Sequence, residues 1–239
     1  LDGPPEEKWN GVLVANEVID ALPTPRFTLR EGEVFEEYVA LDGEGRFVRT
    51  ERPADALLAA SVRHVERYLG SLFVDGYRSE LLPQLPYWLQ AVMGGLQAGA
   101  MLFVDYGYPR REYYLPDRDG GTLRAFYRHR VHNDAYLWPG LQDLTASVDF
   151  TALAEAGTQA GFELAGYCTQ AGFLLAHGLQ DRLEEAEQRA DEALLLRLRN
   201  EARQLTLPTG MGERFQVMGF SRDVEFAAAF LSDDLTWRL

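Results

Sequence analysis

Three polar side chains follow a short apolar run near the start of the chain. Residues 12–15 have the length and composition of a buried strand, and a break at Pro23 comes soon after. Between the two lie Asn16, Glu17 and Asp20. In a parallel α/β sheet the ligand binds just beyond the carboxyl ends of the strands. Because polar groups at such an edge are costly to leave unpaired, these side chains need protein partners or a substrate.

A structural explanation exists for the same residues. Asn16 or Asp20 can cap a helix that begins after the strand, since both residue types accept hydrogen bonds from free backbone amides. The stretch by itself leaves the two interpretations open.

The same pattern recurs in residues 99–107, GAMLFVDYG. An apolar run over residues 100–104 ends at Asp105, and Tyr106 follows. Two buried-type strands separated by a helix, each ending in an acid, predict an α/β fold. We expect a doubly wound sheet with a cleft at its carboxyl edge.

The segments between these strands carry readable local signals. Short β-type runs joined by glycine-containing turns predict a β-meander insertion over residues 24–50. Apolar residues at helical spacing predict helices over residues 54–69, stopped by Gly70, and over residues 83–97. Residues 77–82 are short enough to be a strand or a turn.

The last third of the chain continues the α/β alternation. We expect helices over residues 149–160, with Asp149 as a plausible cap, 172–178 and 180–205, and strands over residues 161–168 and 213–221. No internal repeat is evident, so the whole of residues 1–239 is predicted to form one domain.

A long aromatic segment, residues 108–148, is predicted to be an ordered lid or substrate loop. His129 and His132 are three residues apart and have the spacing of a metal pair, but no third ligand is near. We therefore expect loop-bracing hydrogen bonds and no metal. Asp143 is either a substrate ligand or the brace of a structural turn.

Composition excludes several classes of partner. The formal net charge is −14, from 23 basic and 37 acidic residues, which disfavours nucleic-acid binding. Cys168 is the only cysteine, and its apolar surroundings indicate a buried structural thiol. A single cysteine favours a reducing, cytoplasmic location. No apolar run approaches the ~18 residues of a membrane span.

Four stretches in order resemble one known family. NEVIDALP after its apolar strand, FVDYGY, the segment GGTLRAFYRHRVHNDAYLWPGLQDLTASVDF and the late MGERFQVMGF are similar to motifs of the MidA-like S-adenosylmethionine-dependent methyltransferases. That family includes a mitochondrial arginine methyltransferase that assists respiratory complex I assembly. The resemblance covers nearly the whole chain and implies a Rossmann-like sheet of seven strands with family-specific insertions.

One departure from the family is large. Its glycine-rich loop and the acid after its second strand precede the NEVIDALP-type strand, and nothing before Gly11 supplies either. The resemblance therefore implies the C-terminal two-thirds of a methyltransferase, strands four to seven. This chain alone is expected to be inactive, because half of the S-adenosylmethionine site is absent.

The resemblance also implies roles for the polar residues. Asn16 and Glu17 would lie where cofactor and acceptor meet, and Glu17 would hold an acceptor guanidinium. Asp20 would share a helical face with Glu17 if the segment is helical, so that the pair clamps the cation; bracing of the backbone is the alternative. Further substrate-binding candidates are Asp105, Tyr106, His129 and Asp143. Met211, Gly212 and Glu213 match a family motif whose glycine indicates close backbone packing.

These inferences give two main hypotheses. The first is a protein arginine methyltransferase acting on an arginine-bearing acceptor protein; the second is a non-catalytic assembly factor that has lost cofactor binding. A hydrolase or a dehydrogenase has little support, because there is no G-x-S-x-G elbow and no dinucleotide fingerprint. Without strands one to three, strand four would have an open edge, which we expect to pair with another chain or with a second copy in a homodimer.

Overall fold

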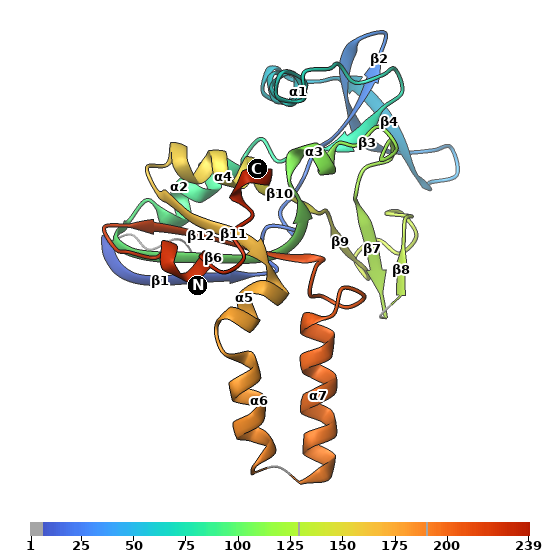
Figure 1. The fold of residues 1–239 in the computed structure, drawn as a ribbon. Helices are drawn as coiled ribbons and strands as arrows, with labels where there is room; N and C mark the ends of the chain where they lie inside the picture. The colour runs from blue at the N-terminus through green and yellow to red at the C-terminus, as the bar shows by residue number, and fades with distance from the viewer. Residues whose placement is uncertain (1–6, 129, 190) are drawn as a thin grey trace. The chain divides into compact units, whose positions relative to one another are not determined.

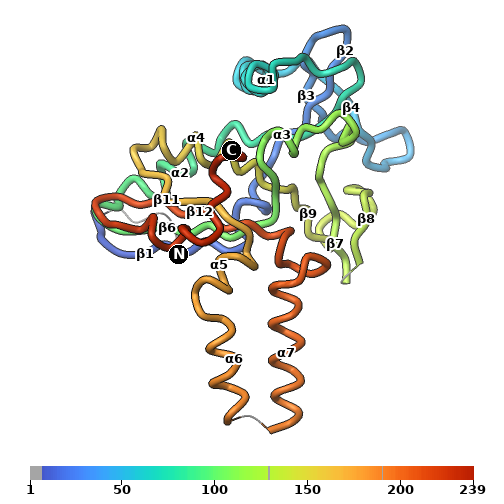
Figure 2. The backbone as a smooth tube through the Cα atoms, viewed as in Figure 1, coloured from blue at the N-terminus to red at the C-terminus, as the bar shows by residue number. Residues whose placement is uncertain are grey.

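The computed structural model describes residues 7–128, 130–189 and 191–239. The contacts between residues divide the chain into two compact units. Figures 1 and 2 colour the chain by residue number, from blue at the N-terminus to red at the C-terminus. The first unit comprises Leu1–Val18, Pro86–Gly107 and Phe150–Leu239, and the second comprises Ile19–Leu85 and Tyr108–Asp149.

The first unit is built on a mixed sheet. Its strands are β1 (Trp9–Asn16), β6 (Leu96–Tyr108), β11 (Glu163–Thr169) and β12 (Phe215–Arg222), and they pair in the order β1-β6-β12-β11. β1 runs parallel to β6, whereas β12 is antiparallel to both of its neighbours. The predicted α/β class is confirmed, and the antiparallel strand makes the sheet mixed.

Two helices of the first unit, α2 (Leu85–Met93) and α4 (Phe150–Gln159), lie on the same side of this sheet (Figure 1). Their apolar faces supply buried side chains to the core, among them Leu89, Met93, Phe150 and Leu153. The predicted helix over residues 83–97 is shorter than expected, because residues from Leu96 onward belong to β6.

The prediction of one continuous helix over residues 180–205 is wrong, because the structure has two helices there. After α5 (Gln170–Ala176) the chain forms two helices, α6 (Leu179–Glu187) and α7 (Glu192–Thr206), which extend away from the sheet as a hairpin (Figure 1). Asp191 caps α7 by accepting a hydrogen bond from the Leu194 amide at 2.8 Å. A good N-cap starts a new helix even where apolar spacing continues, which is why periodicity alone did not show the break.

The C-terminal segment contains the 3₁₀ helices η1 (Ala227–Phe230) and η2 (Thr236–Arg238), and both contact β11. Phe230 packs with Cys168 and Val217 in a buried cluster. Cys168 is 1% exposed, and burial raises the pKa of its thiol to about 12. The prediction of a structural thiol is therefore confirmed, since the reactive species is the thiolate.

The second unit contains the predicted β-meander. β2 (Arg26–Arg30), β3 (Glu33–Leu41) and β4 (Phe47–Pro53) pair antiparallel in sequence order, which confirms the hairpins. β5 (Arg78–Glu80) adds to the free side of β2, so the undecided residues 77–82 contain a strand.

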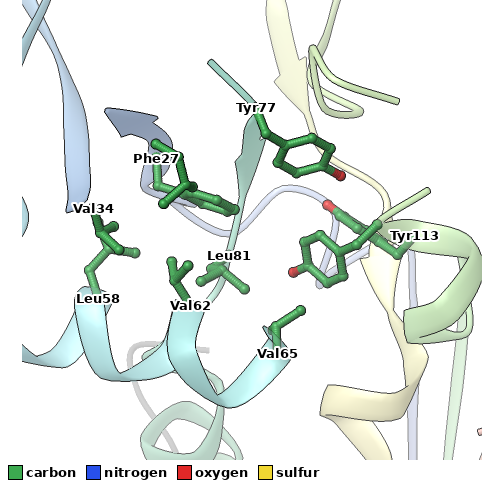
Figure 3. Close-up of a cluster of buried hydrophobic side chains, with 10 residues drawn as sticks. Phe27, Val34, Leu58, Val62, Val65, Tyr77, Leu81 and Tyr113 are labelled. Carbon is green, nitrogen blue, oxygen red and sulfur yellow. The ribbon is translucent and has the colours of Figure 1, made fainter. Parts of the chain in front are cut away.

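Helix α1 (Ala56–Leu69) covers one face of this second sheet. Gly70 ends it in the left-handed conformation, as the sequence predicted, and Asp55 caps its start by accepting a hydrogen bond from the Leu58 amide. Its apolar stripe Leu58, Val62 and Val65 packs against Phe27, Val34 and the tyrosines around Tyr77 (Figure 3). This packing gives the second unit a core of its own.

The predicted lid segment has more regular structure than expected. It contains α3 (Arg110–Tyr113), β7 (Arg124–Tyr127), β8 (Arg130–His132), β9 (Asp143–Thr145) and the short β10 (Val148–Asp149). β7 pairs antiparallel with both β8 and β9. The Tyr127 and Trp138 rings pack with centroids 4.4 Å apart. The role of the segment as a lid stays a prediction. In the described part of the chain, no helix has the length and apolar character of a membrane span.

Candidate active site

The backbone of Glu17 is fixed in an uncommon conformation at the carboxyl end of β1. Its φ is 50°, in the left-handed region that residues other than glycine rarely adopt. Its amide donates a hydrogen bond of 2.9 Å to the carbonyl oxygen of Val104 on the parallel strand β6. β6 therefore fixes the turn, and the Glu17 side chain remains exposed. Glu31, Arg128 and Asp223 have similar φ values, so the feature that distinguishes Glu17 is its place at the carboxyl end of β1.

Asn16 lies beside Glu17 as the last residue of β1. It is exposed and stands opposite Val104 in the register of β1 and β6. Its Nδ2 is 3.5 Å from Oε1 of Glu17. The Asn16 amide and the Glu17 carboxylate therefore lie side by side at the carboxyl end of β1, as the sequence predicted.

Asp105 and Tyr106 are at the same edge, near the end of β6, but in a different environment. Asp105 is only 1% exposed, and its Oδ1 accepts the Tyr106 amide at 2.9 Å. The Tyr106 ring packs edge-on against Phe215, with centroids 5.6 Å apart. The prediction that these residues end the strand is wrong, because β6 continues to Tyr108. Their contact with substrate stays a prediction.

Gln216 is a residue at this edge that the sequence reasoning missed. It stands opposite Asp105 in the pairing of β12 with β6 and is 6% exposed. Its Nε2 donates to the Glu213 carbonyl at 2.7 Å, while its Oε1 has no hydrogen-bond partner among the described residues. A buried amide oxygen of this kind can accept a hydrogen bond from a ligand or from water. The available signal was a single glutamine in an otherwise apolar strand start, FQVMGF.

Asp20 is not on a helical face with Glu17. Residues 17–22 form bends and a turn instead of a helix, so the geometry proposed for a helical pair is wrong. The turn is shaped by distant contacts: the Asp20 carbonyl accepts the Ala146 amide at 3.1 Å. Asp20 is 6% exposed and belongs to the second unit, whereas Glu17 belongs to the first.

The remaining candidates lie in the second unit or outside the description. His129 falls outside the described residues. Asp143 begins β9, is exposed and pairs with Phe126 of β7. His132 packs its ring edge-on against Trp138, with centroids 5.4 Å apart. Within residues 7–128, 130–189 and 191–239 no cluster of metal-ligating side chains occurs.

The close backbone packing expected of Gly212 is confirmed. A Cβ atom at this position would lie 2.2 Å from the Thr206 carbonyl oxygen. The Gly212 carbonyl in turn accepts the Ala171 amide at 3.0 Å. Gly212 therefore joins the end of α7 to the start of α5, which is a structural role.

The carboxyl edge of the first unit fits one side of a polar cofactor. Asn16 and Glu17 offer exposed hydrogen-bonding groups on a backbone fixed by β6. The turn after β1 contains no glycine, however, so it cannot let the backbone approach a ligand as closely as a glycine-rich loop does. The edge can bind part of a ligand and cannot enclose it.

Comparison with known families gives a match over most of the chain. The model of the family described as "Putative S-adenosyl-L-methionine-dependent methyltransferase" matches residues 2–168. Two similar solved structures come from Burkholderia thailandensis. One, bound to S-adenosyl-homocysteine, has a TM-score of 0.88 and 38% identity and covers 100% of this chain and 60% of its own. The other is 40% identical, with the same TM-score, 100% coverage of this chain and 62% of its own.

Curated relatives carry a more specific name. The protein arginine methyltransferase NDUFAF7, mitochondrial, of Danio rerio is 32% identical over 219 residues, which are 86% of this chain and 46% of the relative. The protein of the same name from Rattus norvegicus is 30% identical over 84% of this chain and 44% of its own length. The chain thus spans slightly less than half the length of these relatives.

Proposed function

The chain belongs to the family of S-adenosyl-L-methionine-dependent methyltransferases, and from this premise we propose that the protein transfers methyl groups to arginine side chains of an acceptor protein. The family match and the S-adenosyl-homocysteine in a similar structure support the cofactor. The names of the curated relatives support the acceptor chemistry.

The proposal includes an assignment of the strands. β1, β6, β11 and β12 correspond to strands four, five, six and seven of the family fold. The order β1-β6-β12-β11, with β12 antiparallel, supports it. The glycine-rich loop and the ribose-binding acid then belong to polypeptide outside these 239 residues. The 60% coverage of the S-adenosyl-homocysteine-bound structure is consistent with this.

The observation that carries the site assignment is the left-handed backbone of Glu17. A glutamate held at φ 50° costs stability that glycine or asparagine at the same position would not. Unlike Glu31, which has a similar φ of 51°, Glu17 directly follows a strand that pairs in parallel with β6. Its exposure at the edge of β1 leaves it free to meet a ligand.

The chemistry follows from the charge and shape of a carboxylate. S-adenosyl-L-methionine supplies an electrophilic methyl group on a sulfonium sulfur. Glu17 would hold the acceptor guanidinium through charge-assisted hydrogen bonds and point one nitrogen at that methyl group. Asn16 would donate its side-chain amide to the cofactor or to Glu17. Orientation of this kind supplies up to about 7–11 kcal/mol of barrier lowering.

A direct test combines transfer and binding. The protein expressed from its complete reading frame, incubated with methyl-labelled S-adenosylmethionine and an array of arginine-containing peptides, is expected to label some of them. Lysine-for-arginine versions of those peptides are the control. Absence of label on every arginine peptide would contradict the proposal.

Calorimetric titration of S-adenosylmethionine separates the proposal from the non-catalytic assembly factor. We expect binding by the complete protein and none by residues 1–239 alone, because the strand assignment leaves the glycine-rich loop of the family fold outside these residues. Binding by neither would favour the assembly factor, whose motivating observation is that missing loop. The same titration therefore distinguishes the methyltransferase from the assembly factor.

The free edge of β1 gives a prediction about association. In the described part of the chain β1 pairs with β6 alone, and Val12 and Val14 are 70% and 64% exposed. Residues 1–239 by themselves are expected to associate through this edge, as a homodimer or as larger species. Light scattering after size exclusion measures this, and Val12→Lys with Val14→Lys should shift the chain toward monomer. A clean monomer before substitution would contradict the expectation.

The cytoplasmic location stays a prediction. The curated relatives carry the word mitochondrial in their names and so give it no support. Fractionation of cells that express a tagged complete protein would decide between the two compartments.

A further inference from the structure

The three-stranded sheet of the second unit has a loop folded onto one of its faces. Leu144 of β9 and His132 of β8 both stand opposite Ala125 of β7, so these three side chains are on the same face. Tyr127 lies two residues after Ala125 and is on that face too. The Trp138 ring packs there, with its centroid 4.4 Å from that of Tyr127 and 5.4 Å from that of His132. Trp138 therefore holds the loop between β8 and β9 on the sheet.

Hydrogen bonds fix the conformation of this loop. Gln142 donates from Nε2 to the Ala135 carbonyl at 2.7 Å. The Leu141 amide donates to the Trp138 carbonyl at 3.0 Å and closes a turn. Because the loop is already ordered, it loses little conformational freedom when a partner binds to it.

Four large apolar side chains of the loop and of β9 remain exposed. Their exposed fractions are 48% for Leu137, 39% for Trp138, 68% for Leu141 and 45% for Leu144. We call these four residues the 137–144 face. Single exposed apolar side chains are ordinary on a protein surface, whereas several together on an ordered loop are typical of a protein-binding surface.

Two arginines stand at one end of the same face of the sheet. Arg130 is opposite Tyr127 in the pairing of β8 with β7, and the guanidinium carbon of Arg128 is 5.3 Å from the centroid of the Tyr127 ring. Both arginines are exposed, and neither forms an ion pair with another described residue. A partner that contacts this face responds mainly to them, because charges farther away than about 8 Å are screened at physiological ionic strength.

The acidic residues of the segment do not neutralise this end of the face. Asp143 stands opposite Phe126 and is therefore on the other face of the sheet. Asp134 accepts the Tyr136 amide at 2.9 Å through its Oδ1. Residues 124–145 contain three arginines and two aspartates, a net charge of +1, whereas the whole chain carries −14. The face thus combines exposed apolar groups with a local positive charge.

We propose that the 137–144 face binds a segment of a partner protein in which leucine-type side chains are followed by carboxylates. The apolar side chains of the partner are removed from water against the face, and its carboxylates form charge-assisted hydrogen bonds with Arg128 and Arg130. All of these residues belong to the second unit. The binding does not depend on methyl transfer and so goes beyond the proposed function.

Three short fluorescent peptides test both parts of this proposal in anisotropy titrations with the complete protein. The first peptide contains leucines and glutamates, the second has lysines in place of the glutamates, and the third has serines in place of the leucines. The first is expected to bind about 10-fold or more tightly than either of the others, since burial of a leucine side chain and charge complementarity each contribute about that factor. Equal binding of the three peptides would overturn the proposal.

Substitutions locate the binding on the protein. Leu141→Asp is expected to weaken the first peptide about 10-fold, because it places a charge at the most exposed of the four apolar positions. Leu72→Asp is the matched control, since Leu72 is 76% exposed in the same unit and outside the face. Arg128→Glu combined with Arg130→Glu should reverse the preference toward the lysine peptide. Unchanged affinity in Leu141→Asp, or an unchanged order of peptides in the arginine variant, contradicts the assignment.

Two further measurements on the complete protein detect other occupants of the face. A melting temperature that falls in Leu141→Asp and not in Leu72→Asp means that other parts of the same polypeptide cover the face. A shift from dimer to monomer in light scattering, again in Leu141→Asp alone, means that a second copy covers it. Either result overturns the proposal. Labelling of the arginine peptides is a separate measurement, so the failure of the proposed function and the failure of this inference are distinguishable.

Discussion

Glu17→Gln is expected to lower methyl transfer by the complete protein about 100-fold or more, with S-adenosylmethionine binding largely retained. The amide keeps the size of the side chain but loses the negative charge that pairs with a guanidinium. The charge and the fork geometry orient the nitrogen that reacts, and loss of orientation lowers the rate steeply. The measurement is kcat/KM for an arginine peptide, with the melting temperature recorded to show that folding is intact.

Glu17→Gly is the matched control for the backbone. Glycine relieves the strain of a φ of 50°, so the free energy of unfolding should rise by up to about 1 kcal/mol, less the added flexibility of the unfolded chain. Transfer should fall as in Glu17→Gln. A variant that is at least as stable and much less active would show that the strained glutamate is retained for function. Wild-type turnover in both variants would remove Glu17 from the acceptor site.

Gly219→Ala is expected to lower the free energy of unfolding by about 1–3 kcal/mol. A Cβ at this position would lie 2.5 Å from Cε2 of Phe230, a ring that is 2% exposed. Gly219 is paired directly with Gly166 across β11 and β12, and a Cβ at Gly166 would lie 2.2 Å from Cγ of the same ring. The two glycines together form the slot into which Phe230 packs.

Denaturant titration of the variants measures this effect and its cause. In a Phe230→Ala background the clash is absent, so Gly219→Ala should cost little there, and the two substitutions should be strongly non-additive. Gly43→Ala serves as a control, because nothing lies within 4 Å of a Cβ at that turn position. Additive effects of Gly219→Ala and Phe230→Ala would contradict the slot.

Local patterns predicted most of the regular elements. The apolar runs before Asn16 and Asp105 became β1 and β6, and the glycine turns of the meander joined β2, β3 and β4. The burial predicted for the first run is wrong, because Val12 and Val14 are 70% and 64% exposed on a strand that pairs on one side only. Gly70 ends α1 as predicted. These features depend on neighbours in sequence, since turns, caps and periodicity are set within a few residues.

The order and direction of the strands depended on contacts that no local pattern encodes. β12 is the last strand of the chain, yet it lies between β6 and β11 and runs antiparallel to both. The three-stranded sheet of β7, β8 and β9 was missed for a related reason: its strands are short and contain several charged residues, so the alternation was weak.

The sequence by itself determined the α/β class, the family and the position of Asn16 and Glu17 after a strand, because residue type and short-range spacing suffice for these. Only the tertiary structure decided the backbone of Glu17, the turn at Asp20 and the burial of Glu80. The first depends on a hydrogen bond to Val104, the second on one to Ala146, and the third on Thr122 and Tyr113. Tyr113 is 33 residues from Glu80 along the chain, and the partners of Glu17 and Asp20 are farther away from them. The stretch VLVANEVIDALP therefore predicted which polar groups are present but not their geometry.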